Sequence, residues 1–237
     1  MRQTFCYLTG ILFLVLTVSL VSCDSSYMAN PDNEAIPSQG SGNAPLSIGS
    51  DATVHQNSNL FRFDDGTMIE NATASLLRNP SGVRMRIHTN GLQAGDTFTV
   101  WWVIFNNPDE CENPVDGLTA CSEPDLFNPA TGPSILYAAG NIVGGTGTST
   151  FADALQVNDV SGCQPPWDEF DLCGAGLEDP YASEIHLIVR THGPKIPGMV
   201  NEQINTFAGG CTPESSFGAG DGPNECADLQ FAAFMAE

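Results

Sequence analysis

The chain has 237 residues and carries 28 Asp and Glu against only 7 Lys and Arg, a formal net charge of −21. This argues against nucleic-acid binding, which needs clustered Lys and Arg to contact phosphates. It also disfavours electrostatic attachment to anionic lipid, so any attachment to a bilayer must come from another source.

Residues 1–22 have the organisation of an export signal. Arg2 adds a positive charge ahead of an uncharged apolar run from Phe5 to Val21. A short apolar segment behind a basic start is typical of a signal peptide rather than a membrane-spanning helix.

The end of this segment, Leu20-Val21-Ser22-Cys23, resembles the bacterial lipobox. The resemblance implies cleavage before Cys23, acylation of that cysteine and stable anchoring in a lipid bilayer of the cell envelope, with the domain facing the periplasm or the exterior. The alternative is an ordinary secretory signal followed by an incidental cysteine. Residues 23–50 are rich in Ser, Asn, Pro, Gly and Ala, which predicts a flexible tether, and we expect the folded domain to occupy residues 51–237.

The remaining cysteines support export. Cys6 lies in the signal and Cys23 is the expected lipid site, which leaves an even number in the domain. In an exported chain this predicts disulfides, and closeness in sequence favours the pairs Cys111–Cys121, Cys163–Cys173 and Cys211–Cys226. A zinc site is disfavoured because the chain contains no Cys-x-x-Cys.

The hydrophobic pattern predicts strands separated by turn-rich segments. The expected strands are residues 67–77, 83–88, 96–106, 134–143, 148–157, 184–190 and 227–235. Val200, Ile204 and Phe207 have the spacing of one short amphipathic helix. This order predicts an all-β domain, an antiparallel β-sandwich of jelly-roll or immunoglobulin-like type with long disulfide-stapled loops.

The segment 96–106 is expected to be the central strand, because both of its faces carry apolar side chains. Ala138, Ala139 and Gly140 are small residues in the middle of another strand, and we expect them to make room for Trp101 or Trp102. This predicts that residues 134–143 pair with the central strand. The stapled loops, the short helix or both would cover Trp101.

Two motifs, TVWWVIFNNP at residues 99–108 and HLIVRTHGP at residues 186–194, resemble a group of exported bacterial proteins to which no activity is attached. A weaker similarity is to chordin-type β domains, which also have a Phe-Thr-Val strand after a Gly-Asp turn. Their His-rich motif is absent from this sequence. Neither resemblance implies an activity.

Basic side chains form the main candidate ligand site. Two strands carry them with one parity each: Arg84, Arg86 and His88 in one, and His186, Arg190 and His192, with Glu184, in the other. If the two strands are adjacent, they form an Arg and His patch able to bind a carboxylate or phosphate. The alternative is a solvated sheet face on which these residues pair with carboxylates.

Two kinds of metal site are conceivable from the residue types. His186 and His192, with His88, have the chemistry of transition-metal ligands but no known spacing. Acidic loops suit calcium, which binds carboxylate and carbonyl oxygens. The main calcium candidates are Asp109, Glu110, Glu112 and Asp116, and further acidic residues are Asp168, Glu169, Asp171, Asp221, Glu225 and Asp228.

Catalytic motifs are missing from the sequence: it has no Gly-x-Ser-x-Gly and no His-Glu-x-x-His. We therefore expect a membrane-anchored lipoprotein with a binding or structural module and no cofactor other than calcium. The alternative is a hydrolase of envelope or extracellular polymers with its site between the stapled loops.

Overall fold

The computed structural model describes residues 53–115 and 117–237. These residues belong to one compact unit, Ser47–Glu237. The expected signal peptide, Cys23, the tether and Asp116 lie outside the described residues. No helix in the described part of the chain is long and apolar enough to cross a membrane.

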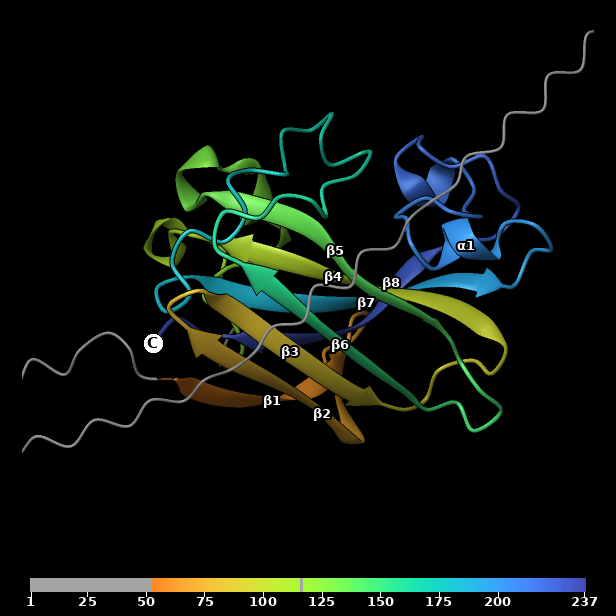
Figure 1. The fold of residues 1–237 in the computed structure, drawn as a ribbon, viewed down its shortest axis with the longest axis horizontal. Coiled ribbons are helices and arrows are strands. Elements are labelled where there is room, and N and C mark those ends of the chain that lie inside the picture. The colour runs from red at the N-terminus through yellow and green to blue at the C-terminus, as the bar shows by residue number, and fades with distance from the viewer. Residues whose placement is uncertain (1–52, 116) are drawn as a thin grey trace, which may run out of the picture. The chain divides into compact units, whose positions relative to one another are not determined.

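The domain is built from strands, with only short helical segments between them (Figure 1). The strands are β1 (Val54–Arg62), β2 (Met68–Asn79), β3 (Gly82–Thr89), β4 (Asp96–Phe105), β5 (Pro133–Ile142), β6 (Ser149–Gln156), β7 (Glu184–Pro194) and β8 (Ala227–Phe234). The helical segments are α1 (Val200–Gln203) and the 3₁₀ turns η1 (Pro108–Glu110), η2 (Glu123–Phe127), η3 (Pro129–Thr131) and η4 (Glu214–Ser216).

All eight strands belong to one antiparallel sheet in the order β5-β4-β7-β8-β1-β2-β3-β6. The sheet curls until its two end strands approach each other, and Asn141 Nδ2 of β5 donates to Ser149 Oγ of β6 at 3.0 Å. Its halves therefore face each other across a single core, an architecture between a sandwich and a closed barrel. The expected all-β antiparallel class is confirmed.

Alternation along the strands fills this core. Val83, Met85 and Ile87 of β3 are buried, whereas the residues between them are exposed. The same two-residue period brings Trp102 and Ile104 of β4 into the core. The described strand β1 was not expected, because Leu60 is the only fully buried residue in it and no apolar alternation marks it.

The central position of β4 is confirmed. It pairs with β5 on one side and β7 on the other, and every residue after Asp96 is buried. Pairing with β5 is also as expected, and Ala138 and Ala139 pack against the core cluster that contains Trp102. Gly140 has a different reason to be small. A Cβ on Gly140 would lie 1.7 Å from the carbonyl oxygen of Ile204, so Gly140 admits the backbone that follows α1 rather than a tryptophan.

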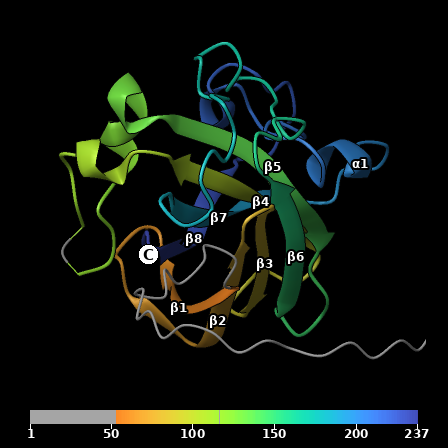
Figure 2. The same cartoon turned by 60° about the vertical axis from the view of Figure 1, so that its left-hand side comes forward.

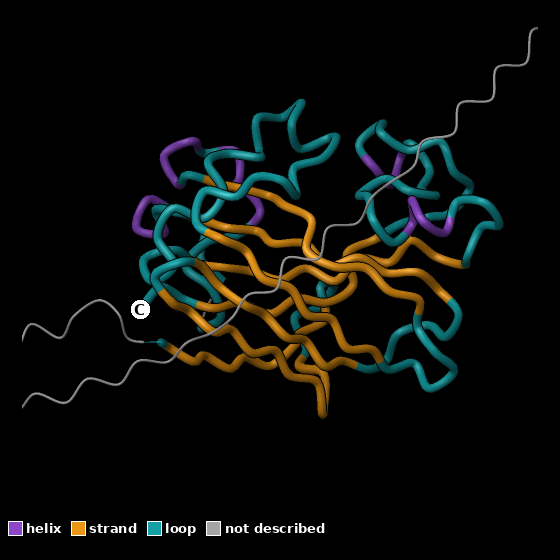
Figure 3. The backbone as a smooth tube through the Cα atoms, viewed as in Figure 1, coloured by secondary structure: helices purple, strands orange, loops and turns teal. Residues whose placement is uncertain are grey.

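Three disulfides join Cys111 to Cys121, Cys163 to Cys173 and Cys211 to Cys226, which confirms the expected pairing. The loops that they close gather around β4, β5 and β7 (Figures 2 and 3). The first loop also faces the turn between β1 and β2, because Leu118 and Phe63 line one hollow. The second loop also protects the free edge of β5, because Ile135 N donates to Leu172 O and Tyr137 N to Gly162 O.

One end of the core is closed by Arg78, which is fully buried. Its guanidinium donates to Gln56 Oε1 and to the carbonyl oxygens of Pro180, Ser183, Phe234 and Met235. Burial lowers the pKa of Arg78 to about 10, so it remains charged at neutral pH. The side chain thus ties β2 to β8 and to the segment that enters β7.

Candidate binding cavity on the outer face of β4 and β7

An apolar cavity of ≈210 Å³ lies on the outer face of β4 and β7, beneath the stapled loops. We call it the aromatic cavity. Trp101 and Phe105 of β4 and His186 and Ile188 of β7 form its floor. The walls come from the loops. Trp167 lies in the second stapled loop and Phe217 in the third, whereas Leu126 follows the first and Phe207 precedes the third. A second hollow of ≈400 Å³ adjoins it and shares His186.

Phe207 is the hub of the aromatic side chains. Its ring centroid lies 4.5 Å from that of Trp167 and 5.4 Å from that of Trp101, both in edge-to-face geometry. Arg190 also lies over this ring, with its Cζ 3.9 Å from the centroid. Phe207 follows the four-residue helix α1 instead of lying within it, so the expected helix is shorter than its apolar spacing indicated. The stapled loops do cover Trp101, as expected.

Phe217 forms an exposed rim of the aromatic cavity. Its side chain is 62 % exposed, and its ring lies 5.6 Å from Trp167 and 6.1 Å from Phe207, measured between centroids. The backbone is left-handed, with φ 54° and ψ 33°, a conformation that bulky residues adopt only at a cost. A phenylalanine that is both exposed and strained is not explained by stability.

On the floor, Glu184 and His186 form a hydrogen-bonded pair. His186 Nε2 lies 2.6 Å from Glu184 Oε1. Glu184 is fully buried and also accepts hydrogen bonds from the backbone N–H groups of Ala120 and Cys121, which attach the first stapled loop to β7. Because the carboxylate only accepts, Nε2 carries a proton, and Nδ1 is the ring nitrogen left for another partner. Nδ1 has no partner among the described residues.

His192 has a structural role. Its Nδ1 donates to Gly209 O at 2.9 Å, so its Nε2 accepts from Thr99 Oγ1 at 2.8 Å, and Thr99 in turn accepts from Trp101 Nε1. Burial lowers the pKa of His192 to about 4, with a further lowering from Arg190 and an opposing hydrogen bond to Gly209. The neutral ring thereby fixes the orientation of the Trp101 indole in the cavity floor.

Two polar groups near Phe207 lack partners within the described residues. Trp167 Nε1 and Arg190 Nε are buried and make no hydrogen bond. Arg190 satisfies its other nitrogens on Asp228 Oδ1, at 3.0 Å, and on the carbonyl oxygen of Ser215. The aromatic wall therefore contains buried donors, which is unusual for a purely structural core.

The expected Arg and His patch is not assembled. β3 and β7 are separated by β8, β1 and β2, so their outward side chains are not neighbours. Arg84, Arg86 and His88 lie on an exposed face of β3. The β7 residues instead lie beneath the loops: Arg190 is paired with Asp228, and His192 is fully buried.

The acidic calcium candidates that the structure describes do not converge. Asp109, Glu110 and Glu112 are exposed, and in the described part of the chain no three carboxylates bring their oxygens together. The carboxylate that organises the first stapled loop is Asp125, which accepts from Glu112 N, Asn113 Nδ2 and Ser122 N. Burial opposes ionisation of Asp125, but these hydrogen bonds outweigh it and lower its pKa.

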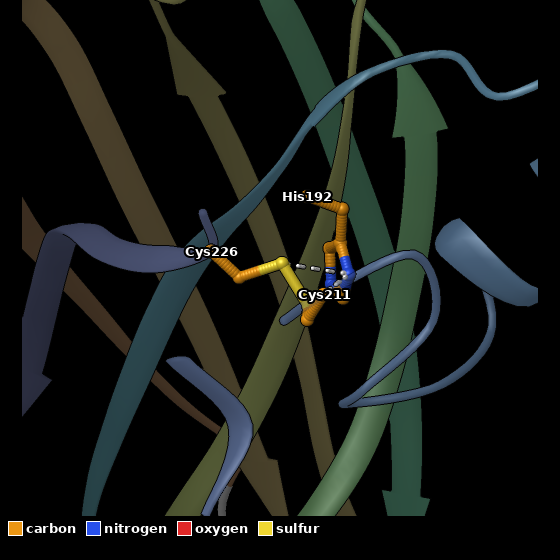
Figure 4. Close-up of side chains that lie close together, drawn as sticks. All are labelled: His192, Cys211 and Cys226. Carbon is orange, nitrogen blue, oxygen red and sulfur yellow. Dashed lines mark hydrogen bonds between the residues drawn. A yellow bond between two sulfur atoms is a disulfide. The ribbon is translucent and has the colours of Figure 1, made fainter. Parts of the chain in front are cut away.

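One group with the chemistry of metal ligands does come together: His192, Cys211 and Cys226 (Figure 4). The two sulfur atoms are bonded to each other, and His192 Nδ1 lies 3.4 Å from Cys211 Sγ. A disulfide offers no thiolate, and both ring nitrogens of His192 are already hydrogen-bonded. This group is therefore a histidine packed against a disulfide and does not have the ligands of a metal site. The three histidines also do not form a site together, because His186 is bound to Glu184 and His88 lies on β3.

No protein-family model, curated protein or solved structure matches the chain. The geometry of the aromatic cavity is therefore the basis for assigning a function. Sequence reasoning anticipated Trp101 and the loops over it, but missed Phe207, Phe217 and the Glu184–His186 pair. The only local signal for Phe207 and Phe217 was their placement in segments rich in Gly, Pro and Ser, where burial is not expected. Glu184 and His186 share one parity of a strand, which indicated a common face but not their pairing.

Proposed function

We propose that the chain is an exported, lipid-anchored protein whose domain binds a small ligand in the aromatic cavity. The supporting observation is the cavity itself. Side chains from two strands and from separate loops converge on one apolar space, and His186 in its floor is held in place by the buried Glu184. Small-molecule sites commonly have this composition, mostly apolar walls with a few placed polar groups.

The exposed rim is consistent with a ligand rather than with packing. Phe217 is strained and exposed, and burying it would remove apolar surface from water. A ligand that enters between Phe217 and the cavity floor gains this contact at once. The expected anchor at Cys23 would hold such a binding domain at the outer side of a membrane.

Native mass spectrometry of the gently purified protein tests the binding function. A bound small molecule should survive purification, and Phe217→Ala should reduce its occupancy. Phe127→Ala is the matched control, because Phe127 is 68 % exposed and does not line the aromatic cavity. Equal occupancy in both variants would place the ligand elsewhere and contradict the proposal. The lipid anchor is tested separately: Cys23→Ala should leave the protein in the soluble fraction.

One observation favours the second candidate, a hydrolase. His186 is held by a carboxylate and lines the cavity, as a general base is held in many hydrolytic sites. No serine, threonine or cysteine side chain is hydrogen-bonded to His186 among the described residues, so the nucleophile would have to be water. Turnover of ester or glycoside reporters that disappears in His186→Ala would favour this candidate.

A further inference from the structure

The carboxylates among the described residues that line the aromatic cavity are not matched by a lining Lys or Arg. Glu123 and Asp228 lie in its wall, and none of the described lining residues is Lys or Arg. Glu123 is exposed and makes no ion pair within the described residues, so its charge is available to a ligand. Asp228 is already paired with Arg190 through Oδ1. Against a chain charge of −21, the cavity attracts cations and repels anions.

His186 adds an acceptor to the cavity floor. The residue is 7 % exposed and lines the cavity, and its Nδ1 has no hydrogen-bond partner among the described residues. With Nε2–H committed to Glu184, the singly protonated ring has an unshared pair on Nδ1, which fits a ligand that brings an N–H or O–H donor. A carboxylate ligand has no proton to offer here. An ammonium group has one, together with the charge that Glu123 complements.

The aromatic side chains of the cavity also suit a cationic ligand. The faces and edges of Trp101, Trp167 and Phe217 surround the space, and aromatic faces attract organic cations. The protein already makes such a contact at this place, since the Arg190 guanidinium lies over Phe207. That cation is covered and paired, which leaves the remaining rings for a ligand.

We infer that the aromatic cavity binds an amphiphilic ammonium ion, a protonated amine attached to an aromatic or aliphatic body. The apolar body lies against Trp167 and Phe217, and the ammonium donates to His186 Nδ1 and is balanced by Glu123. This inference rests on the proposed binding function and specifies the class of its ligand.

Three soluble probes of similar size test it: 2-phenylethylamine as the cation, 2-phenylethanol as the neutral counterpart and 3-phenylpropanoate as the anion. Titration calorimetry with the folded, disulfide-bonded domain should give the tightest binding for the amine, about tenfold over the alcohol, and the weakest for the carboxylate. If the alcohol or carboxylate binds as tightly as the amine, the ammonium inference is wrong and the binding function stands. If none binds at millimolar concentration, both are wrong.

Substitutions separate a local charge effect from a general one. Glu123→Gln should weaken amine binding about threefold to tenfold and leave alcohol binding unchanged. Glu70→Gln is the matched control, since Glu70 is an exposed residue of β2 outside the cavity and changes the net charge by the same amount. Equal loss in both variants would mean that only the overall charge matters, and would overturn the assignment of Glu123. Circular dichroism verifies that each variant is folded.

Discussion

Exchanging Phe217 for glycine and, separately, for alanine distinguishes backbone strain from side-chain contact. With 62 % of its surface exposed, Phe217 buries little over a third of it, a contribution of about 0.5–1 kcal/mol to stability. The left-handed backbone costs an L-residue about 1–2 kcal/mol, and glycine avoids this cost but loses about 0.5–1 kcal/mol of backbone entropy. Phe217→Ala should therefore be destabilised by about 1 kcal/mol, whereas Phe217→Gly should be close to wild type.

Urea unfolding of the two variants measures this difference. Phe217→Gly should exceed Phe217→Ala in free energy of unfolding by about 0.5–1 kcal/mol. Both variants remove the same ring, so both should bind 2-phenylethylamine with similarly reduced affinity. A glycine variant that is as stable as wild type but has lost binding would show that Phe217 is retained for the ligand. Equal stability of the glycine and alanine variants would refute the strain argument, and unchanged binding would refute the role of the rim.

The other predictions concern the groups that hold the cavity in place. Arg78→Leu leaves five acceptor groups without their donor. In urea titrations it should lower the free energy of unfolding by about 3–5 kcal/mol. Arg84 is exposed, so Arg84→Leu should change this free energy by less than about 0.5 kcal/mol. The folded-state pKa of His192 is lowered to about 4, so between about pH 6.5 and 4 only the unfolded chain takes up the proton. The free energy of unfolding of the wild type should therefore fall by roughly 3 kcal/mol as pH is lowered through this window. The slope of stability against pH in this window should be shallower in His192→Gln, and an identical slope would contradict the assignment. Replacing Cys163 and Cys173 together by serine should lower the free energy of unfolding by roughly 2–3 kcal/mol. It should also weaken probe binding, because Trp167 lies in the loop that this disulfide closes. Unchanged affinity would show that the disulfide does not position Trp167.

Local patterns were sufficient to anticipate most strands and the disulfides. The alternation in β3 and the doubly apolar β4 follow directly from which side chains must leave water. β1 could not be recognised, because the inward residues Gln56 and Ser58 are polar. Gln56 is retained there for a partner on another strand, the guanidinium of Arg78, which no local pattern indicates.

The candidate site was harder to anticipate because it depends on contacts between distant segments. Histidine and arginine on β7 were expected to face solvent, as polar residues on an outer sheet face usually do. The stapled loops cover that face instead, so Glu184 and His192 are fully buried and acquire partners in residues 99, 120, 121 and 209. Glu184 and His192 therefore support a cavity instead of contributing charge to the surface.

The cavity assignment is tested most directly by the indole N–H signals in a ¹H–¹⁵N spectrum, because the chain has three tryptophans in different places. Trp101 and Trp167 line the aromatic cavity, whereas Trp102 lies in the core and donates to Asp153 Oδ2 at 2.9 Å. Adding the amine, alcohol and carboxylate probes in turn, we expect the signals of Trp101 and Trp167 to move with at least one probe, most with the amine, while Trp102 stays in place. No movement with any probe, or movement of Trp102 as large as that of the others, would contradict binding in this cavity.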